Sequence, residues 1–300
     1  MTSSTVRRAI FPVAGLATRF LPVTKAQSKY VLPLLDKPTI QYAVEEAIAS
    51  HLEQVIMVAG GAYSAIAEHF DRAPELEFYL EDRGKRDLLA VLAEVDRLSD
   101  LVDITYIQQK EPLGLGHAIW LARRLVDGEP CAVLLPDDVI LGGEPCLKQL
   151  MAAYAETGAT VLAVRRVARD QISRYGIIAK GASIGRLHEV TDLVEKPSPD
   201  DAPSDLAIFG RYVLTPDVFT ALGDTKPGVG KEIQLTDAMR ATLKGGRIVA
   251  CEFEGDYYDT GTIAGYLRAN LALALKRPDL RDAMLSVVRE LIDASEITIK

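Results

Sequence analysis

The chain has 300 residues, 48% of them apolar and 25% charged, and its 34 Lys and Arg against 42 Asp and Glu give a net charge of −8. This composition excludes a wholly disordered or collagen-like chain, and a chain of this length buries enough surface to need no disulfides. The acidic balance argues against duplex nucleic acid as the main partner, since that binding depends on a basic face. It still allows a local basic pocket for a phosphorylated small molecule.

Cysteine usage and apolar run lengths indicate the compartment. Cys131, Cys146 and Cys251 are odd in number and widely spaced, so they predict neither a disulfide framework nor a metal clip and favour a reducing cytoplasm. No apolar run approaches the roughly 18 residues of a membrane span. The apolar stretch 9–17 is closed by Arg19 and makes a poor secretory signal. We expect a cytoplasmic protein with neither a membrane nor a nucleic-acid partner.

Short apolar runs alternate with helical patterns in the first half of the chain. Buried strands are predicted at 9–13, 55–59, 104–107 and 131–135, and helices at 40–48 and 117–126. This alternation is typical of a parallel sheet covered by helices on both faces. Such sheets bind ligands beyond the carboxyl ends of their strands, where Gly15 and Asp137 fall.

From about residue 159 the pattern changes. Strands are predicted at 161–167, 186–194, 206–214 and 247–253, some of which could be antiparallel, and helices at 265–275 and 280–294 close the chain. Residues 71–102 are charged and mostly helical, and they indicate an insertion with a solvated outer face.

The first strand runs into a segment suited to phosphate. It reads Gly15-Leu16-Ala17-Thr18-Arg19-Phe20-Leu21-Pro22, then Lys25, Lys29, Leu32-Pro33 and Asp36-Lys37-Pro38. Small residues after a strand let backbone N–H groups face phosphate oxygens, while Arg supplies a fork and Lys a point charge. It is not a Walker loop. A lone Gly-x-x-Thr-Arg would fit an ordinary surface loop better, so the phosphate interpretation depends mainly on the resemblance described below.

Asp137 follows the fourth predicted strand, a good place for a metal carboxylate, although a loop-capping aspartate is the commoner role for such a residue taken alone. Adjacent residues at the end of a strand face opposite ways. Asp138 is therefore expected to point elsewhere.

Seven further segments follow in order. They are Gln109-Lys110-Glu111-Pro112-Leu113-Gly114-Leu115-Gly116-His117-Ala118, Leu135-Pro136-Asp137-Asp138, Tyr175-Gly176-Ile177-Ile178, Val194-Glu195-Lys196-Pro197, Gly210-Arg211-Tyr212, Glu232-Ile233-Gln234-Leu235-Thr236-Asp237-Ala238 and Tyr258-Asp259-Thr260-Gly261. Together they resemble the sugar-1-phosphate nucleotidyltransferases, and most of all the bacterial UTP–glucose-1-phosphate uridylyltransferases. The resemblance covers roughly residues 7–279.

The resemblance implies transfer of a uridylyl group from UTP to glucose 1-phosphate, giving UDP-glucose and pyrophosphate. A phosphate oxygen of the sugar phosphate attacks the α-phosphorus, and because this nucleophile is already an anion, little general base is needed. Positioning and charge neutralisation are the main requirements. They imply Mg²⁺, which prefers oxygen ligands and phosphates.

The resemblance also assigns roles to residues, each of which would otherwise be taken for an ordinary loop or surface residue. Arg19 and Lys29 would hold the triphosphate, with Lys25 a lesser candidate, and Asp137 and Asp259 would bind the metal. Glu195 would bind sugar hydroxyls, Lys196 the sugar phosphate, and Gly176 would let the sugar approach the backbone. The nucleotide would lie against Ala14, Gly15, Tyr30, Gln109 and Gly114. His117 is expected to serve the start of a helix rather than to act as a base.

Several positions depart from the family pattern. Ala17 and Tyr30 stand where the family usually has Gly and a uracil-contacting Glu, Gly60-Gly61-Ala62-Tyr63 replaces a basic stretch, and Thr260 and Ile263 replace Cys and Lys. An alanine at 17 would be strained if that position needs a positive φ. These changes leave two alternatives open: a glucose-1-phosphate thymidylyltransferase using dTTP, or a diverged, non-catalytic nucleotide-sugar-binding paralogue.

We therefore expect an α/β protein with a mixed, mainly parallel central sheet flanked by helices, Rossmann-like in its first half. Residues 1–279 would form the nucleotidyltransferase domain, with a nucleotide-binding half at about 7–158 and a sugar-phosphate-binding half at about 159–262. The helices of 263–300 are candidates for an oligomer contact, since the family forms dimers and tetramers.

Overall fold

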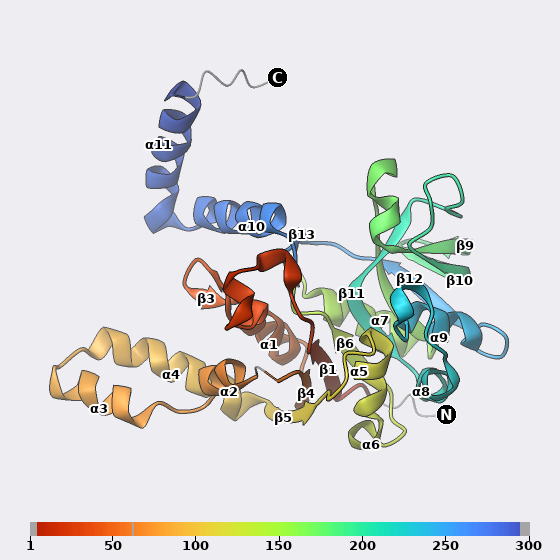
Figure 1. The fold of residues 1–300 in the computed structure, drawn as a ribbon, viewed down its shortest axis with the longest axis horizontal. Helices are drawn as coiled ribbons and strands as arrows, with labels where there is room; N and C mark the ends of the chain where they lie inside the picture. Colours follow the sequence, from red (N-terminus) through yellow and green to blue (C-terminus); the bar gives the residue numbers. More distant parts are fainter. Residues whose placement is uncertain (1–4, 62, 295–300) are drawn as a thin grey trace.

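A nine-stranded sheet runs through the computed structural model, which describes residues 5–61 and 63–294 (Figure 1). The strand order is β5-β4-β1-β6-β11-β8-β12-β10-β9. Ala62, in the segment that departs from the family pattern, and residues 295–300, at the end of the expected C-terminal helices, lie outside the described residues.

The first half of the sheet is parallel, as the apolar runs predicted. It consists of β1 (Arg8–Val13), β4 (Gln54–Ala59), β5 (Asp103–Gln108) and β6 (Cys131–Leu134). β1 pairs in parallel with both β4 and β6, and β4 pairs with β5. The strand order therefore reverses at β1, and a crevice opens beyond the carboxyl ends of β1 and β6, where α/β sheets bind ligands.

The second half of the sheet is mostly antiparallel, so the prediction of a mainly parallel sheet is wrong. Its strands are β8 (Thr160–Arg166), β9 (Gly176–Ile184), β10 (Leu187–Glu195), β11 (Leu206–Leu214) and β12 (Ile248–Glu252). β11 lies antiparallel to β6 and β8, and β10 antiparallel to β12 and β9, whereas β8 and β12 are parallel. Half of the adjacent strand pairs along this order in the described sheet are thus antiparallel. Antiparallel strands do not need the helical crossover that joins parallel ones.

Strand β9 and two short two-stranded ribbons were not predicted from the sequence. The ribbons pair β2 (Pro33–Leu34) with β3 (Lys37–Pro38), and β7 (Asp138–Leu141) with β13 (Asp256–Asp259). β9 is buried only in its first three residues and exposed over most of the remainder. It therefore carries no sustained apolar alternation.

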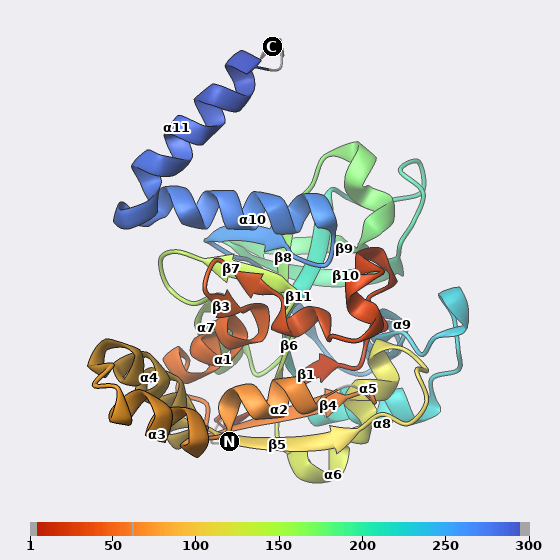
Figure 2. The ribbon, with the colours of Figure 1, turned by 60° about the vertical axis from the view of Figure 1, so that its left-hand side comes forward.

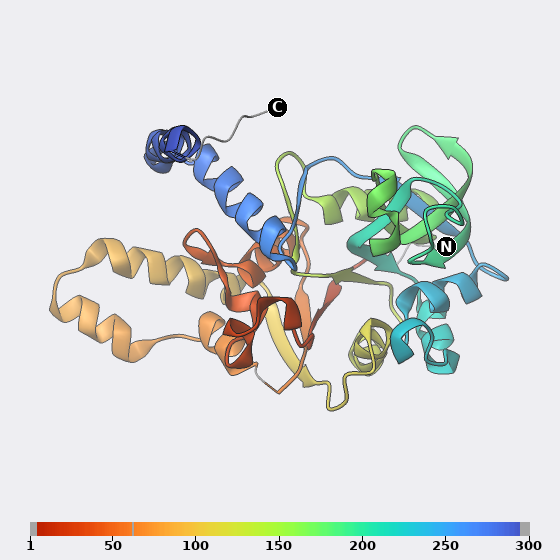
Figure 3. The same ribbon diagram turned by 45° about the horizontal axis from the view of Figure 1, so that its top comes forward.

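Helices cover both faces of the sheet, as Figures 2 and 3 show. One core joins β1 and β4 to α1 (Thr39–Ala49), α2 (Ser64–Phe70) and α7 (Cys146–Thr157). The other joins the opposite side chains of the same strands to α5 (Leu115–Leu121), α6 (Arg123–Val126), α8 (Pro216–Asp224) and α9 (Leu235–Thr242). Alternate residues of β1 enter the two cores: Phe11 lies in the first and Ile10 in the second.

Two helical pairs extend beyond this body (Figure 1). The charged insertion forms α3 (Pro74–Asp82) and α4 (Arg86–Leu101), and the chain closes with α10 (Ile263–Lys276) and α11 (Pro278–Ala294). α4 and α11 bury none of their residues, and α11 runs away from the sheet (Figure 2). Within the described ranges, every helix is too short or too polar to cross a membrane.

A buried ion pair ties the two halves of the sheet together. Arg211 of β11 is 1% exposed and donates from Nε and Nη2 to Oε2 of Glu46 in α1, at 3.1 and 2.8 Å. Its Nη1 donates to the carbonyl oxygens of Leu135 and Gly210. Oε1 of Glu46 accepts the N–H of Leu147, in the first turn of α7. The network is complete, as a buried ion pair requires.

Replacing Arg211 with Met should therefore lower the free energy of unfolding by about 3–5 kcal/mol, since Glu46 would keep a buried charge without its partner. Urea unfolding followed by circular dichroism measures this. The matched control is Arg240→Met, because Arg240 makes an equally close but exposed pair with Asp192. The control should cost about 1 kcal/mol or less. Equal losses in the two variants would show that burial does not set the strength of the inner pair.

Candidate active site

The segment after β1 turns tightly past the crevice. Ala17 has φ +49°, in the left-handed region, so the strain expected of an alanine at this position is present. Its carbonyl oxygen accepts the Phe20 N–H and the Thr24 hydroxyl. These two bonds hold Thr18 and Arg19 in a single helical turn beside the crevice.

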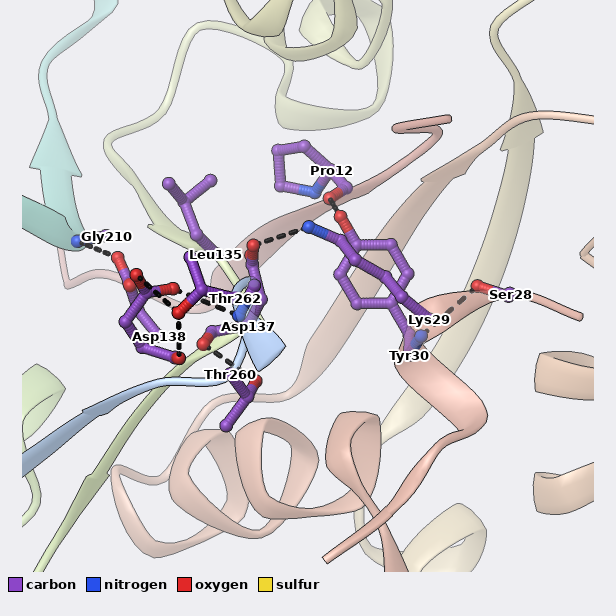
Figure 4. Close-up of polar contacts among 12 residues, drawn as sticks. Pro12, Ser28, Lys29, Tyr30, Leu135, Asp137, Asp138, Gly210, Thr260 and Thr262 are labelled. Carbon is purple, nitrogen blue, oxygen red and sulfur yellow. Dashed lines mark hydrogen bonds and ion pairs between the residues drawn. The ribbon is translucent and has the colours of Figure 1, made fainter. Parts of the chain in front are cut away.

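Lys29 and Asp137 meet at the centre of the site (Figure 4). Nζ of Lys29 donates to Oδ2 of Asp137 at 2.5 Å, and both side chains are mostly buried. Burial lowers the pKa of Lys29, but Tyr30 and the carboxylates of Asp137 and Asp138 outweigh it, so this pKa is raised above its usual value. Lys29 is therefore a fixed positive charge at the carboxyl end of the parallel strands.

Tyr30 lies beneath the loop, with 4% of its surface exposed. Its hydroxyl donates to the carbonyl oxygen of Pro12 at 3.2 Å, and burial raises its pKa to about 12 (Figure 4). A β-carbon at Gly15 would lie 3.7 Å from this hydroxyl. The ring thus supports the floor of the site, and its hydroxyl is already paired with the main chain.

A cavity of about 500 Å³ brings the predicted nucleotide residues together. Its lining includes Ala14, Gly15, Tyr30, Gln109 and Gly114, with Lys29 and Asp137 at one end. The side-chain nitrogen of Gln109 lies 3.2 Å from the Gly114 carbonyl oxygen and 3.0 Å from Nδ1 of His117. His117 stands in the first turn of α5, where it orients Gln109, and this agrees with the structural role expected of it.

Glu232 also lines this cavity and had no role assigned from the sequence. Gly114 has φ +102°, and a β-carbon there would lie 2.6 Å from Cβ of Glu232 and 3.0 Å from the Ile233 carbonyl oxygen. Only glycine fits this close approach. The quoted segment that begins at Glu232 was the available signal, but nothing in it indicated which side chain faces the cavity.

A second cavity, of about 450 Å³, gathers positive charge. Arg19, Arg174 and Lys196 line it, together with Asp138 and Asp259. Nη2 of Arg174 donates to Oδ2 of Asp259 at 2.8 Å. No role was predicted for Arg174 from the sequence. The only indication of one was its position directly before the Tyr175-Gly176 segment.

Glu195 and Lys196 are neighbours whose side chains would point to opposite faces of an extended strand, but here they lie together. Nζ of Lys196 lies 3.3 Å from Oε1 of Glu195. Strand β10 ends at Glu195, and Lys196 has φ +46°, so the extended geometry that separates neighbouring side chains does not continue.

Gly176 and Glu195 do lie together, as their expected sugar-binding roles require. The two residues are paired across β9 and β10. A β-carbon at Gly176 would lie 3.2 Å from Oε2 of Glu195, which accepts the Thr236 hydroxyl at 2.7 Å. A side chain at position 176 would therefore crowd the carboxylate of Glu195.

Asp137 and Asp259 approach each other across Gly261. A β-carbon at Gly261 would lie 2.8 Å from Oδ2 of Asp137 and 3.1 Å from Oδ1 of Asp259. No third His, Cys, Asp or Glu completes a metal-binding group within 5–61 and 63–294. Two carboxylates suffice for Mg²⁺, which usually keeps waters and takes the rest of its ligands from substrate phosphates. The donor set therefore fits that ion.

Lys25 differs from the other predicted cations. It is exposed, at the end of a short helical turn, and lines neither of the two cavities. Its interpretation as a surface lysine is favoured over a role at the phosphates.

Comparison with known proteins places this geometry in a family. The model of the nucleotidyl transferase family matches residues 9–276. A UTP–glucose-1-phosphate uridylyltransferase of Bacillus subtilis is 47% identical over 97% of this chain and 99% of its own length. The chain belongs to the UTP–glucose-1-phosphate uridylyltransferase family of nucleotidyl transferases.

Solved structures of the family agree with the fold. A UDP-glucose pyrophosphorylase complexed with UDP-glucose is 39% identical and superposes with a TM-score of 0.83, covering 91% of this chain and 100% of that one. A UTP-bound UGPase from Acinetobacter baumannii is 35% identical, with a TM-score of 0.88 over 96% of this chain and 100% of that one. The α/β architecture with its mixed sheet is thus that of the uridylyltransferase family.

Substituting Gly261 by Ala should lower nucleotidyl transfer about 10- to 100-fold, the range for disturbing the surroundings of metal ligands. The added methyl would press on the carboxylates of both Asp137 and Asp259. Pyrophosphate release as a function of Mg²⁺ concentration measures the effect. Gly245→Ala is the matched control, since its β-carbon would meet nothing within 4 Å. Wild-type activity in both variants would contradict the crowding argument.

Proposed function

We propose that this protein transfers the uridylyl group of UTP to glucose 1-phosphate, giving UDP-glucose and pyrophosphate. The observation that carries the proposal is that Asp137 of the first cavity and Asp259 of the second approach each other across Gly261. The first cavity is lined by the residues expected at a nucleotide and the second by three cations. The names of relatives that cover nearly the whole chain support the choice of UTP and glucose 1-phosphate.

The cations would position the phosphates and offset their charge. Lys29 and Arg19 would hold the triphosphate and stabilise the leaving pyrophosphate, and Lys196 and Arg174 would hold the sugar phosphate in line with the α-phosphorus. Because the attacking oxygen is already ionised, this positioning supplies most of what the reaction needs. Mg²⁺ held by Asp137 and Asp259 would add further neutralisation of the phosphate charge.

Neutral and acidic groups would select the organic parts of the substrates. Gln109 and the open main chain at Gly114 would contact the base, and Glu195 would accept hydrogen bonds from sugar hydroxyls beside Gly176. We assign residues 7–158, with their Rossmann-like strand order, to nucleotide binding and residues 159–262 to sugar-phosphate binding. Three buried free cysteines support a cytoplasmic setting, and the exposed helices of 263–294 support a homodimer or homotetramer.

A thymidylyl-transferring enzyme is the second candidate, because Tyr30 stands where the family usually has a glutamate that contacts uracil. Its hydroxyl is paired with Pro12, so position 30 presents no carboxylate to the N3–H of uracil. Selectivity between uracil and thymine then depends on the space around the base at C5.

The test is pyrophosphate release with Mg²⁺ and glucose 1-phosphate, in separate assays with UTP, dTTP, ATP, CTP and GTP. Fast release with UTP and slow release with the others is the expected result. Preference for dTTP would replace the uridylyl assignment with the thymidylyl one. Silence with all five triphosphates, in a folded sample that binds UDP-glucose, would identify a non-catalytic binding protein.

Lys29→Ala and Arg19→Ala should each lower turnover about 100-fold or more, corresponding to about 3 kcal/mol of transition-state stabilisation. Lys25→Ala is the matched control, because it removes a lysine from the same segment outside both cavities. Steady-state pyrophosphate release measures all three. An Arg19 or Lys29 variant as active as the Lys25 variant would lose its place at the triphosphate.

A further inference from the structure

The two candidate metal carboxylates stand together at one end of a ribbon outside the main sheet. In this ribbon β7 and β13 run antiparallel, and Asp138 is paired with Asp259. Asp137 directly precedes β7, and Asp259 is the last residue of β13. Their separation is therefore set by the ribbon and by whatever fixes it to the rest of the molecule.

Asp138 fixes the ribbon to the main sheet. Its Oδ2 accepts the N–H of Gly210 in β11 at 2.8 Å, and its Oδ1 accepts the hydroxyl of Tyr257 in β13 at 2.7 Å (Figure 4 shows the Gly210 contact). A β-carbon at Gly210 would collide with Oδ2 of Asp138. Both carboxylate oxygens are therefore used, and Asp138 joins three segments instead of serving as a ligand.

Thr260 fixes the same end of the ribbon from the other strand. Its N–H and its hydroxyl both donate to the carbonyl oxygen of Asp137, each at 2.8 Å, and the residue is 4% exposed. The N–H of Gly261 donates to Oδ1 of Asp259 at 3.0 Å. The main chain of Asp137 is thus held by Thr260, the residue that follows Asp259.

We propose that Asp138, Tyr257 and Thr260 are positioning residues that hold Asp137 and Asp259 at the separation a divalent cation requires. The proposal rests on the proposed function only for the metal site itself. Groups that orient metal ligands commonly change metal affinity or activity 10- to 100-fold when they are removed. We call Asp138, Tyr257 and Thr260 the clamp. The hydroxyls of Tyr257 and Thr260 are its two parts that can be removed with little loss of packing.

Tyr257→Phe keeps the ring, which packs edge-on against Phe209 at 4.5 Å, and removes only the donor to Asp138. Thr260→Val keeps the shape of the side chain and removes one donor to Asp137, while Thr260→Ser keeps that donor. Tyr42→Phe is the matched control. Tyr42 packs in the same cluster as Val139 and Tyr258 of the ribbon, but its hydroxyl is bonded to the Leu34 carbonyl oxygen and to neither Asp137 nor Asp138.

The decisive measurement is Mn²⁺ binding to the protein in the presence of UTP and without glucose 1-phosphate, from electron paramagnetic resonance. Because UTP itself binds Mn²⁺, the reference is the same Mn²⁺ and UTP without protein. Tyr257→Phe and Thr260→Val should weaken Mn²⁺ binding about 10-fold or more. The value of kcat should fall in parallel, with little change in KM for glucose 1-phosphate. Thr260→Ser should restore most of the loss, and Tyr42→Phe should bind Mn²⁺ as the wild type does.

Two results would overturn the proposal. One is a lower melting temperature in Tyr257→Phe and Thr260→Val with unchanged Mn²⁺ binding, which would mean a purely structural role. The other is a wild-type protein that binds no Mn²⁺ with UTP, which would leave nothing to position. A wild type that binds Mn²⁺ with UTP yet releases no pyrophosphate would refute the proposed function alone, and the comparison of variants would still decide the clamp.

Discussion

The buried pair of Arg211 and Glu46 is the constraint on which the rest of the structure depends. Removing two charges from water costs several kcal/mol for each ion unless every donor and acceptor is paired. Here that requirement draws together α1, the first turn of α7, strand β11 and the turn after β6. The Leu135 carbonyl oxygen bound by Arg211 lies two residues before Asp137. The network of Arg211 and Glu46 therefore helps to fix the position of Asp137, although it lies outside both cavities.

Paired opposite charges at the centre of the site explain how an acidic chain can attract anions. Lys29 lies against Asp137 and Arg174 against Asp259. Each carboxylate keeps a cation oriented at the edge of a cavity, and each cation lowers the cost of holding two carboxylates near one another. In the proposed function phosphate oxygens would share these cations, so the local arrangement of charge would matter more than the net charge.

The sequence predicted the parallel half of the fold better than the rest. The apolar runs that became β1, β4 and β6 are buried from both faces, which leaves a clear signal. β5, at the edge of the sheet, is only partly buried. β9 is half exposed, and the ribbon of β7 and β13 is too short for any periodicity. Most site residues came from the family resemblance. The left-handed turn at Lys196 and the contact of Arg174 with Asp259 depend on tertiary geometry that no local pattern encodes.

Trp120 is the single tryptophan of the chain. It belongs to α5, whose residues Leu115 and Ala118 line the first cavity. Its ring stacks on His117 with centroids 6.5 Å apart, and the Arg123 guanidinium covers it at 3.5 Å. His117 in turn contacts Gln109, which borders the cavity. His117 therefore contacts both Gln109 and the indole of Trp120, and a movement of Gln109 would change the surroundings of the indole. We therefore expect the emission of this indole to change when the cavity is filled, with no label attached.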